Sequence, residues 1–431
     1  MVKVNIFWFR RDLRLDDNNG LSHATKSKYP VLPIFIFDPD ITDTLPVNDK
    51  RINFIYDQLQ KINDQLNSKF KSSLLVFKGK PIEVFKKLNS EFNINSVYCN
   101  HDYEPYSIVR DKSVESYLDS KDSKLLSFKD QVIFEKSEVV KNDGNPYVVY
   151  TPYKNKWKIK LKEDITILDE KIIDNNFFFY KNYSLKKIDF YGFEINNDKI
   201  QKFKLNSEII NNYSERRNFP NLNATSKIGP FLRFGTISIR KIVHHLLNFK
   251  EDTYLDELIW REFFMQILFH FPHTSNQSFK LKYDKIQWLN DKKMFNAWKS
   301  GRTGFPIVDA GMRELNSTGF MHNRVRMITA SFLCKHLLID WRWGEKYFAL
   351  KLNDYEMASN IGNWQWASGS GVDAAPYFRI FNPHTQILKF DKKQLYINKW
   401  VDTQSDEYPN EIIDHKFARK RCLETYKKYI D

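Results

Sequence analysis

Five short apolar runs, separated by polar stretches, dominate the first 130 residues of the sequence. The runs are Val4–Arg10, Val31–Asp38, Leu74–Gly79, Ser96–Asn100 and Leu125–Lys129. Stretches of helical character, such as Arg51–Phe70 and Pro81–Phe92, separate several of them. Apolar strands that alternate with helices are typical of a parallel sheet with both faces covered. We therefore expect an α/β domain built on a doubly wound parallel sheet over residues 1–134.

The rest of the chain favours a different class of structure. Residues 135–205 are rich in Lys, Asn, Asp and Phe and carry no chemical motif. We expect them to form an interdomain linker with a few short helices. From residue 206 onward the pattern becomes helical and stays so, which predicts an all-α domain over residues 206–431. Two domains are also the default for a chain of 431 residues.

Composition narrows the class of protein. No apolar run approaches the ~20 residues that a membrane span needs, and the first residues become charged too soon for a secretion signal. The three cysteines are too few and too scattered for a disulfide framework or a metal site. We expect a cytoplasmic monomer with no metal and no membrane partner.

Positive charge is concentrated in the second half of the chain. Residues 1–200 hold 32 Lys and Arg against 29 Asp and Glu, whereas residues 201–431 hold 35 against 24. A basic excess in a region that also holds most of the Trp residues suits nucleic-acid binding with aromatic stacking platforms. The alternative is that these lysines only keep the surface soluble.

The stretch Asn353–Pro383 has the most unusual composition in the chain. It combines Trp364 and Trp366, three acidic residues and a backbone rich in Gly, Ser and Asn. A wide cavity would need this mixture, with carboxylates to orient a polar ligand and indoles to stack on it. A Gly-rich loop beside an aromatic core is the alternative.

This stretch resembles the flavin-binding signature of the photolyase/cryptochrome family. FWFRRDLRLDDNNGL near the amino terminus and ELIWREF at Glu257–Phe263 are similar to further signatures of the family. The resemblance implies an antenna-binding α/β domain and a helical domain that binds reduced FAD and DNA. It further implies a class I photolyase that splits cyclobutane pyrimidine dimers in UV-damaged DNA by light-driven electron transfer to the flipped-out dimer. A cryptochrome-type photoreceptor without repair activity is the alternative.

Several residues match the family's flavin contacts. Thr225–Gly229 is a small polar cluster ahead of an apolar segment, and such a cluster at a helix start either caps the helix or binds an anion. The resemblance aligns it with the flavin pyrophosphate loop, with Lys227 in place of the usual Arg. The FAD-binding residues implied in this way are Tyr213, Thr225, Ser226, Lys227, Ile228, Gly229, Arg261, Asp354, Tyr355, Glu356 and Asn360.

A lesion pocket is implied by two helical spacings. Glu257, Trp260 and Arg261 share one helical face, as do Asn323 and Met327. The alternative for the first group is a surface Glu–Arg pair beside a half-buried Trp, and His322 beside the second group is expected to be structural. The catalytic residues implied are Glu257, Trp260, Asn323, Met327 and Trp366. The DNA-binding residues implied are Arg217, Glu257, Trp260, Asn323, Arg324, Trp366 and Arg379.

Two further roles follow from the resemblance alone. Trp364, Trp341 and Trp288 match a relay that carries electrons to the flavin, although a buried indole is more often simply part of a core. Glu104 matches an antenna contact, for methenyltetrahydrofolate or for a deazaflavin or flavin. Its alternative role is to cap the following helix. Phe320 and Glu356 depart from the family pattern, which has Trp and Asp there.

Overall fold

The computed structural model describes residues 2–180 and 184–430. The chain forms two compact units, and each unit is discontinuous in the sequence. Unit 1 comprises residues 1–135, 158–203 and 227–248, and unit 2 comprises residues 136–157, 204–226 and 249–431. Within the described part of the chain, no helix is long and apolar enough to cross a membrane.

Unit 1 is built on a five-stranded sheet whose paired strands are all parallel, in the order β3-β2-β1-β4-β5. Its strands are β1 Lys3–Phe9, β2 Val31–Phe37, β3 Leu75–Lys78, β4 Asn93–Asn100 and β5 Lys124–Phe128. Its helices include α1 Asn19–Thr25, α2 Pro39–Thr42, α3 Lys50–Phe70, α4 Pro81–Glu91, α5 Pro105–Asp119, α9 Gly229–Arg233 and α10 Ile239–Leu246. The predicted α/β domain with a parallel sheet is thereby confirmed.

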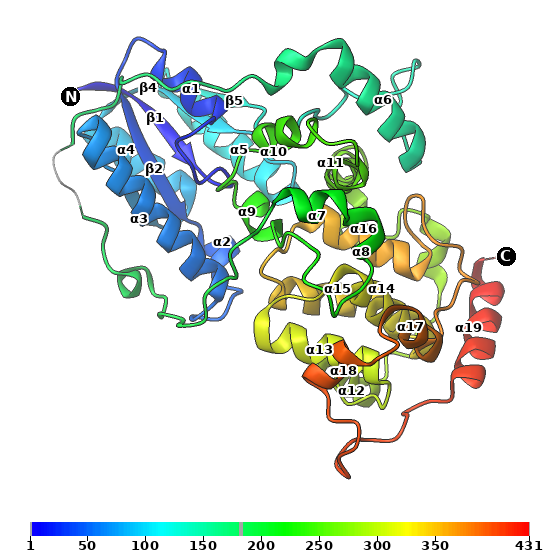
Figure 1. Cartoon of the computed structure of the whole chain (residues 1–431). Coiled ribbons are helices and arrows are strands. Elements are labelled where there is room, and N and C mark those ends of the chain that lie inside the picture. The colour runs from blue at the N-terminus through cyan, green and yellow to red at the C-terminus, as the bar shows by residue number, and fades with distance from the viewer. Residues whose placement is uncertain (1, 181–183, 431) are drawn as a thin grey trace. The chain divides into compact units, whose positions relative to one another are not determined.

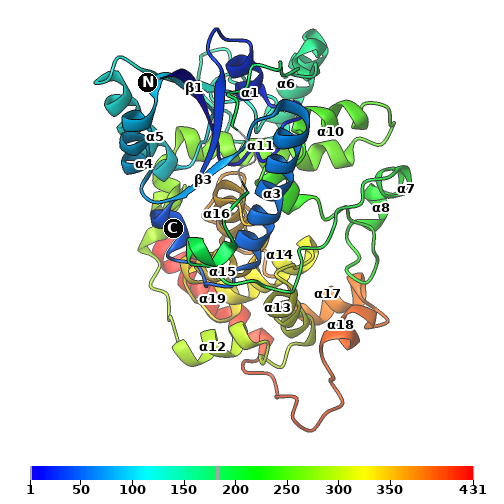
Figure 2. The same ribbon diagram turned by 90° about the vertical axis from the view of Figure 1, so that its left-hand side faces the viewer.

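Both faces of this sheet are covered by helices. This cover is needed because β1 has apolar side chains on both faces, which would otherwise be exposed to water. Phe7 and Phe9 pack in one cluster with the apolar face of α3, whereas Ile6 and Trp8 pack in another with α4 and α5. Figure 2 shows α3 on one side of the sheet and α4 and α5 on the other. A near-continuous apolar strand is what a doubly covered parallel sheet requires.

Unit 2 is helical. Its helices include α7 Ser207–Asn211, α8 Tyr213–Arg216, α11 Thr253–His270, α12 Lys292–Ser300, α13 Pro306–Thr318, α14 Asn323–Ser331, the π-helix η5 Phe332–His336, α15 Trp341–Lys351, α16 Met357–Ser368, α17 Pro383–Phe390, α18 Leu395–Trp400 and α19 His415–Ile430. Figure 1 shows the helices of this unit, in which α16 packs against both α14 and α15. Its main core contains the buried indoles of Trp298, Trp341 and Trp364. The predicted all-α class of this domain is confirmed, although residues 227–248 of the predicted range 206–431 belong to unit 1.

The first turns of α14 and α16 are capped by side chains. The ring of His322 accepts the Arg324 backbone N–H at 3.2 Å and so caps α14. Glu356 caps α16 by accepting the backbone N–H groups of Ala358 and Ser359. The backbone of Gly369 then ends α16 in the left-handed region, at φ +93°.

The stretch 135–205 is more ordered than the predicted linker. It contains the 14-residue helix α6 Tyr150–Glu163, whose first half belongs to unit 2. Further along, Phe177 packs in the core of unit 1 and pairs with Val31 of β2. The sequence of this stretch has no clear periodicity, because single apolar side chains such as Phe177 pack against other elements.

Candidate functional site

A cavity in unit 2 brings together residues from α14, α15, α16 and the segment before α16. It holds about 580 Å³ of empty space, including its mouth open to solvent. Its lining residues are Asn323, Arg326, Met327, Ala330, Phe348, Leu352, Asp354, Tyr355, Glu356, Ser359, Asn360, Asn363, Trp364, Trp366 and Ala367.

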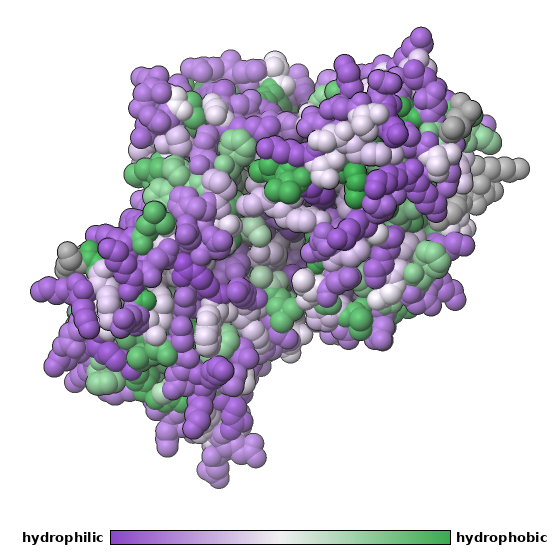
Figure 3. All heavy atoms as spheres, turned by 180° about the vertical axis from the view of Figure 1, so that it is seen from behind, coloured by the Kyte–Doolittle hydropathy of each residue, from purple (hydrophilic) through white to green (hydrophobic). Residues whose placement is uncertain are grey.

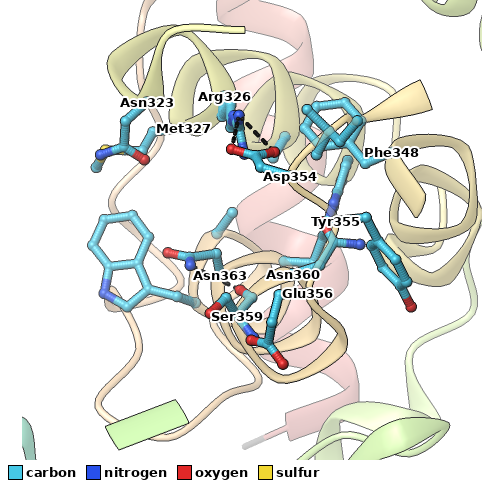
Figure 4. A pocket seen from close by; sticks show the side chains of 15 residues that line it. Asn323, Arg326, Met327, Phe348, Asp354, Tyr355, Glu356, Ser359, Asn360 and Asn363 are labelled. Carbon is cyan, nitrogen blue, oxygen red and sulfur yellow. Dashed lines mark hydrogen bonds and ion pairs between the residues drawn. The ribbon is translucent and has the colours of Figure 1, made fainter. Parts of the chain in front are cut away.

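One wall of the cavity is a face of α14. Asn323 and Met327 are one helical turn apart, so both line the cavity as their spacing predicts. Arg326 follows Asn323 by three positions on the same helix, and Figure 4 shows its side chain beside Asp354, to one side of Asn323 and Met327. His322 precedes this face as a buried helix cap, so its expected structural role is confirmed.

An ion pair closes one side of the cavity. Nη2 of Arg326 donates to both carboxylate oxygens of Asp354, at 3.1 and 2.9 Å (Figure 4). Both side chains are partly exposed, at 25% and 20%. Because the guanidinium has further N–H groups, the pair presents donors and acceptors together at the cavity edge.

The opposite wall is a face of α16, on which the amide of Asn360 has a fixed orientation. Its Nδ2 atom donates to the backbone carbonyl and to Oε1 of Glu345, at 3.2 and 2.9 Å. Burial raises the pKa of the Glu345 carboxyl, although the hydrogen bond from Asn360 opposes this shift. Among the described residues no donor reaches Oδ1 of Asn360, so this oxygen can accept a hydrogen bond from a bound ligand.

The predicted residues of α11 lie on one helix but do not line this cavity. Glu257 forms an ion pair with Arg217, and burial raises the pKa of its carboxyl in spite of that positive partner. Trp260 is half-buried and stacks on Tyr150, with ring centroids 3.6 Å apart. Arg261 is on the same helix. Their shared face is confirmed, and their roles stay predictions.

The expected pyrophosphate loop crosses from one unit to the other. Ser226 belongs to unit 2, where its hydroxyl bonds the Tyr254 hydroxyl at 2.6 Å, and Tyr213 packs edge-on against Tyr254. Lys227 belongs to unit 1 and donates to Gln201 at 2.8 Å from a left-handed backbone. A role for the loop, with Thr225, Ile228 and Gly229, stays a prediction.

The three tryptophans of the expected relay differ in burial. Trp364 lines the cavity and, like Trp341, is 2% exposed. Trp288 is only partly buried, and its ring meets Tyr426 at 6.0 Å. Trp298 is a further buried indole, and its ring centroid lies 6.1 Å from that of Trp364. Trp288 is thus the most exposed of the three indoles, as the predicted surface end of the relay requires, and the relay itself stays a prediction.

Two remaining predictions concern the two units separately. In unit 1 the Glu104 carboxylate accepts from Arg11 at 2.8 Å and from Arg233 at 3.0 Å, and it makes no helix-capping bond. Its antenna role stays a prediction.

In unit 2, Arg324 donates to Asn218 and covers the Phe390 ring, whereas Arg379 is exposed. No group of three or more metal-ligating side chains was found among the described residues.

Comparison with known proteins identifies the family. Residues 5–169 match the model of DNA photolyase, and residues 254–406 match that of the FAD binding domain of DNA photolyase. A deoxyribodipyrimidine photo-lyase of Alkalihalophilus pseudofirmus is 34% identical over 97% of each chain. That of Escherichia coli is also 34% identical, over 99% of this chain and 98% of its own. The chain belongs to the photolyase/cryptochrome family.

Solved structures of this family share the fold. A class III photolyase from Agrobacterium tumefaciens is 32% identical, with a TM-score of 0.88 over 100% of this chain and 98% of its own. An archaeal photolyase from Sulfolobus tokodaii with two FAD molecules is 33% identical. Its TM-score is 0.85, over 99% of this chain and 100% of its own. A Synechocystis cryptochrome, 23% identical with a TM-score of 0.84 over 99% of each chain, shares the fold.

The residues of the cavity fit a flavin. A flavin ring needs apolar walls and polar partners at its edge, and Phe348, Leu352 and Met327 supply the first. The Arg326–Asp354 pair and the Oδ1 atom of Asn360 supply the polar partners at the edge of the ring. FAD is therefore the cofactor of the domain that residues 254–406 match, and the lining of the cavity is chemically suited to its flavin ring.

Several residues of the site were missed from sequence. They are Arg326, Glu345, Phe348, Leu352, Ser359 and Asn363. Arg326 and Asn363 each follow a predicted residue by three positions, so helical spacing could have found both. Glu345 gave no such signal, because it reaches Asn360 from a different helix.

Proposed function

We propose that this protein is a class I photolyase that repairs cyclobutane pyrimidine dimers in DNA with light. One observation carries the proposal. Asn323 and Met327 of α14 line the same cavity as Trp366 of α16. The resemblance to the family implies that these three residues contact the lesion. The relatives named deoxyribodipyrimidine photo-lyase, which match nearly the full chain, support the same reaction.

The chain's own residues bind the lesion and exclude water. Extrusion of the damaged pair from the duplex is a known property of photolyases. Trp366 is half-buried at the cavity and can stack on an extruded base, which is worth ~1–3 kcal/mol per base. The Asn323 amide can donate to or accept from a base edge, and Met327 packs beside it. Reduced FAD, when bound, supplies the light-driven electron for ring opening.

Burial of Glu257 favours the protonated form of its carboxyl, and the ion pair with Arg217 opposes this effect. Because burial raises the pKa of this carboxyl, a larger fraction of it is protonated near neutral pH than of an exposed Glu. A protonated carboxyl donates a hydrogen bond to a pyrimidine carbonyl, whereas a carboxylate only accepts.

The lesion type is tested with two oligonucleotides, one with a cyclobutane dimer and one with a 6-4 photoproduct. Since Asn323 and Met327 stand where 6-4 enzymes are expected to have a His pair, we expect the reduced protein to restore only the first under blue light. Chromatography of the products reads the result. Restoration of neither lesion would favour the photoreceptor, and restoration of only the 6-4 lesion would contradict the substrate assignment.

The cellular location and the antenna belong to the same proposal. All three cysteines are free and buried, which suits a reducing cytoplasm. We expect an antenna chromophore in unit 1 near Glu104, either a folate or a second flavin. The absorption spectrum of the purified protein would identify it.

A further inference from the structure

Tyr150 covers one face of the Trp260 indole. The ring planes lie 10° apart, with centroids separated by 3.6 Å. Tyr150 is only 6% exposed, whereas Trp260 is half-buried. A DNA base can therefore reach only the part of the indole that Tyr150 leaves open. Tyr150 itself has too little exposed surface to stack on a base.

Two hydrogen bonds hold Tyr150 in this place. Its hydroxyl donates to the Asp256 carbonyl at 2.6 Å, and its backbone N–H donates to Oδ2 of Asp373 at 3.0 Å. Asp256 belongs to α11, which carries Trp260. Asp373 lies in the segment that follows α16, the helix of Trp366. One residue thus connects α11, which carries Trp260, to the segment that follows the helix of Trp366.

We propose that Tyr150 is a positioning residue of the lesion pocket, which fixes the plane of Trp260 by stacking on it. The open part of the indole is then oriented before DNA arrives. A side chain ordered in advance loses less conformational entropy on binding, so the affinity for the flipped dimer is higher. This inference rests on the proposed function, because it assigns Trp260 to the lesion.

The stacked ring, and not the hydroxyl, carries this role. Parallel aromatic rings in contact attract each other beyond their buried area. Burial, together with the negative charges of Asp256 and Glu257, raises the pKa of Tyr150, so the phenol stays neutral. Tyr150→Phe keeps the ring and removes one hydrogen bond, whereas Tyr150→Leu removes the stacking.

Tyr153 provides a matched control on the same helix. It is 1% exposed, and its ring meets Phe263 at 5.2 Å, as Tyr150 also meets Phe263 at 5.9 Å. No ring contact with Trp260 is formed by Tyr153 in the described structure. Tyr153→Leu therefore reports the cost of losing a buried ring from α6 that does not itself contact the Trp260 ring.

The experiment measures dissociation constants for dimer-containing and undamaged duplexes, on FAD-loaded protein at one salt concentration. Tyr150→Leu should weaken dimer binding about tenfold and leave undamaged DNA unchanged. Tyr150→Phe and Tyr153→Leu should stay within about twofold of the wild type. Added to Trp260→Ala, Tyr150→Leu should have almost no further effect, because it acts through that indole.

Three results would overturn the assignment. They are full dimer preference in Tyr150→Leu, an equal loss of preference in Tyr153→Leu, or a full additional loss in the double variant. A wild-type protein without any preference for the dimer would instead contradict the proposed function, and the role of Tyr150 would fall with it. The two failures are therefore distinguishable in one set of measurements.

Discussion

At the scale of single residues, Gly344 on α15 allows the cavity wall to form. A Cβ atom at this position would lie 2.1 Å from the Trp364 indole. Gly344→Ala should therefore push the indole toward the cavity and lower the free energy of unfolding by about 1–3 kcal/mol. We expect it also to lower the FAD bound per protein. Urea unfolding and flavin absorbance measure the two effects.

Lys346 gives the matched control for this substitution. It lies on the same helix and is exposed, so Lys346→Ala should change stability by less than about 0.5 kcal/mol. Normal flavin content in Gly344→Ala would show that Trp364 can shift without closing the cavity.

At the scale of elements, the π-helix η5 carries a buried histidine that should make stability depend on pH. His336 is stacked on Phe332, and its Nε2 lies 2.8 Å from Nδ1 of His415. Burial, then the neighbouring His415, Arg421 and Lys335, lower the pKa of His336 to about 3. Between that value and the usual pKa of about 6.5 the unfolded state binds more protons, so stability falls as the pH is lowered.

The expected loss from this group between pH 6.5 and 5 is about 2 kcal/mol, measured from urea midpoints. His336→Phe should remove most of that dependence, with a smaller part left to His415, whose pKa is also lowered by burial. Exposed His244 on α10 offers a control, since His244→Gln should leave the pH profile unchanged. An unchanged profile in His336→Phe would assign the pH dependence to other groups.

Two members of the proposed electron relay, Trp341 and Trp364, lie on α15 and α16, and Trp288 lies in the segment before α12. Trp288→Phe should slow photoreduction of oxidised flavin by an external thiol and leave repair by pre-reduced protein intact. The physical reason is that tunnelling decays steeply with distance, so a buried flavin needs oxidisable side chains on the way to the surface. Time-resolved flavin absorbance under illumination checks it.

Tyr426 must be tested beside Trp288, because its ring meets that indole. The double variant Trp288→Phe with Tyr426→Phe excludes the phenol as a substitute donor. Photoreduction at the wild-type rate in the double variant would place Trp288 among purely structural residues.

Sequence periodicity predicted most elements, because local patterns reflect which face is buried. The strands were found with ends shifted by up to three residues, as at β4, which begins at Asn93 rather than Ser96. Asn323 and Met327 were paired correctly because their spacing is local. The Asn360–Glu345 bond and the Tyr150–Trp260 stacking join separate helices, and no pattern within one helix encodes such contacts.

At the scale of the whole molecule, charge and surface agree with a polyanionic partner. The face seen in Figure 3 is mostly hydrophilic, with apolar side chains in small groups. The net charge is +14, of which residues 201–431 contribute +11, from 35 Lys and Arg against 24 Asp and Glu. Charge gives affinity for any DNA, whereas the lesion pocket must give the preference for damage.

These two contributions should separate in a salt titration. Affinity for both DNAs should fall steeply with salt, because bound cations are released from the phosphates. Trp260→Ala should weaken binding of dimer DNA by ~1–3 kcal/mol, since one stacking surface is lost, and leave the salt slope unchanged. Arg324→Gln should weaken both DNAs alike and reduce the slope by about 1, since one phosphate contact is lost. Equal losses on damaged and undamaged DNA in Trp260→Ala would place that indole outside the lesion pocket.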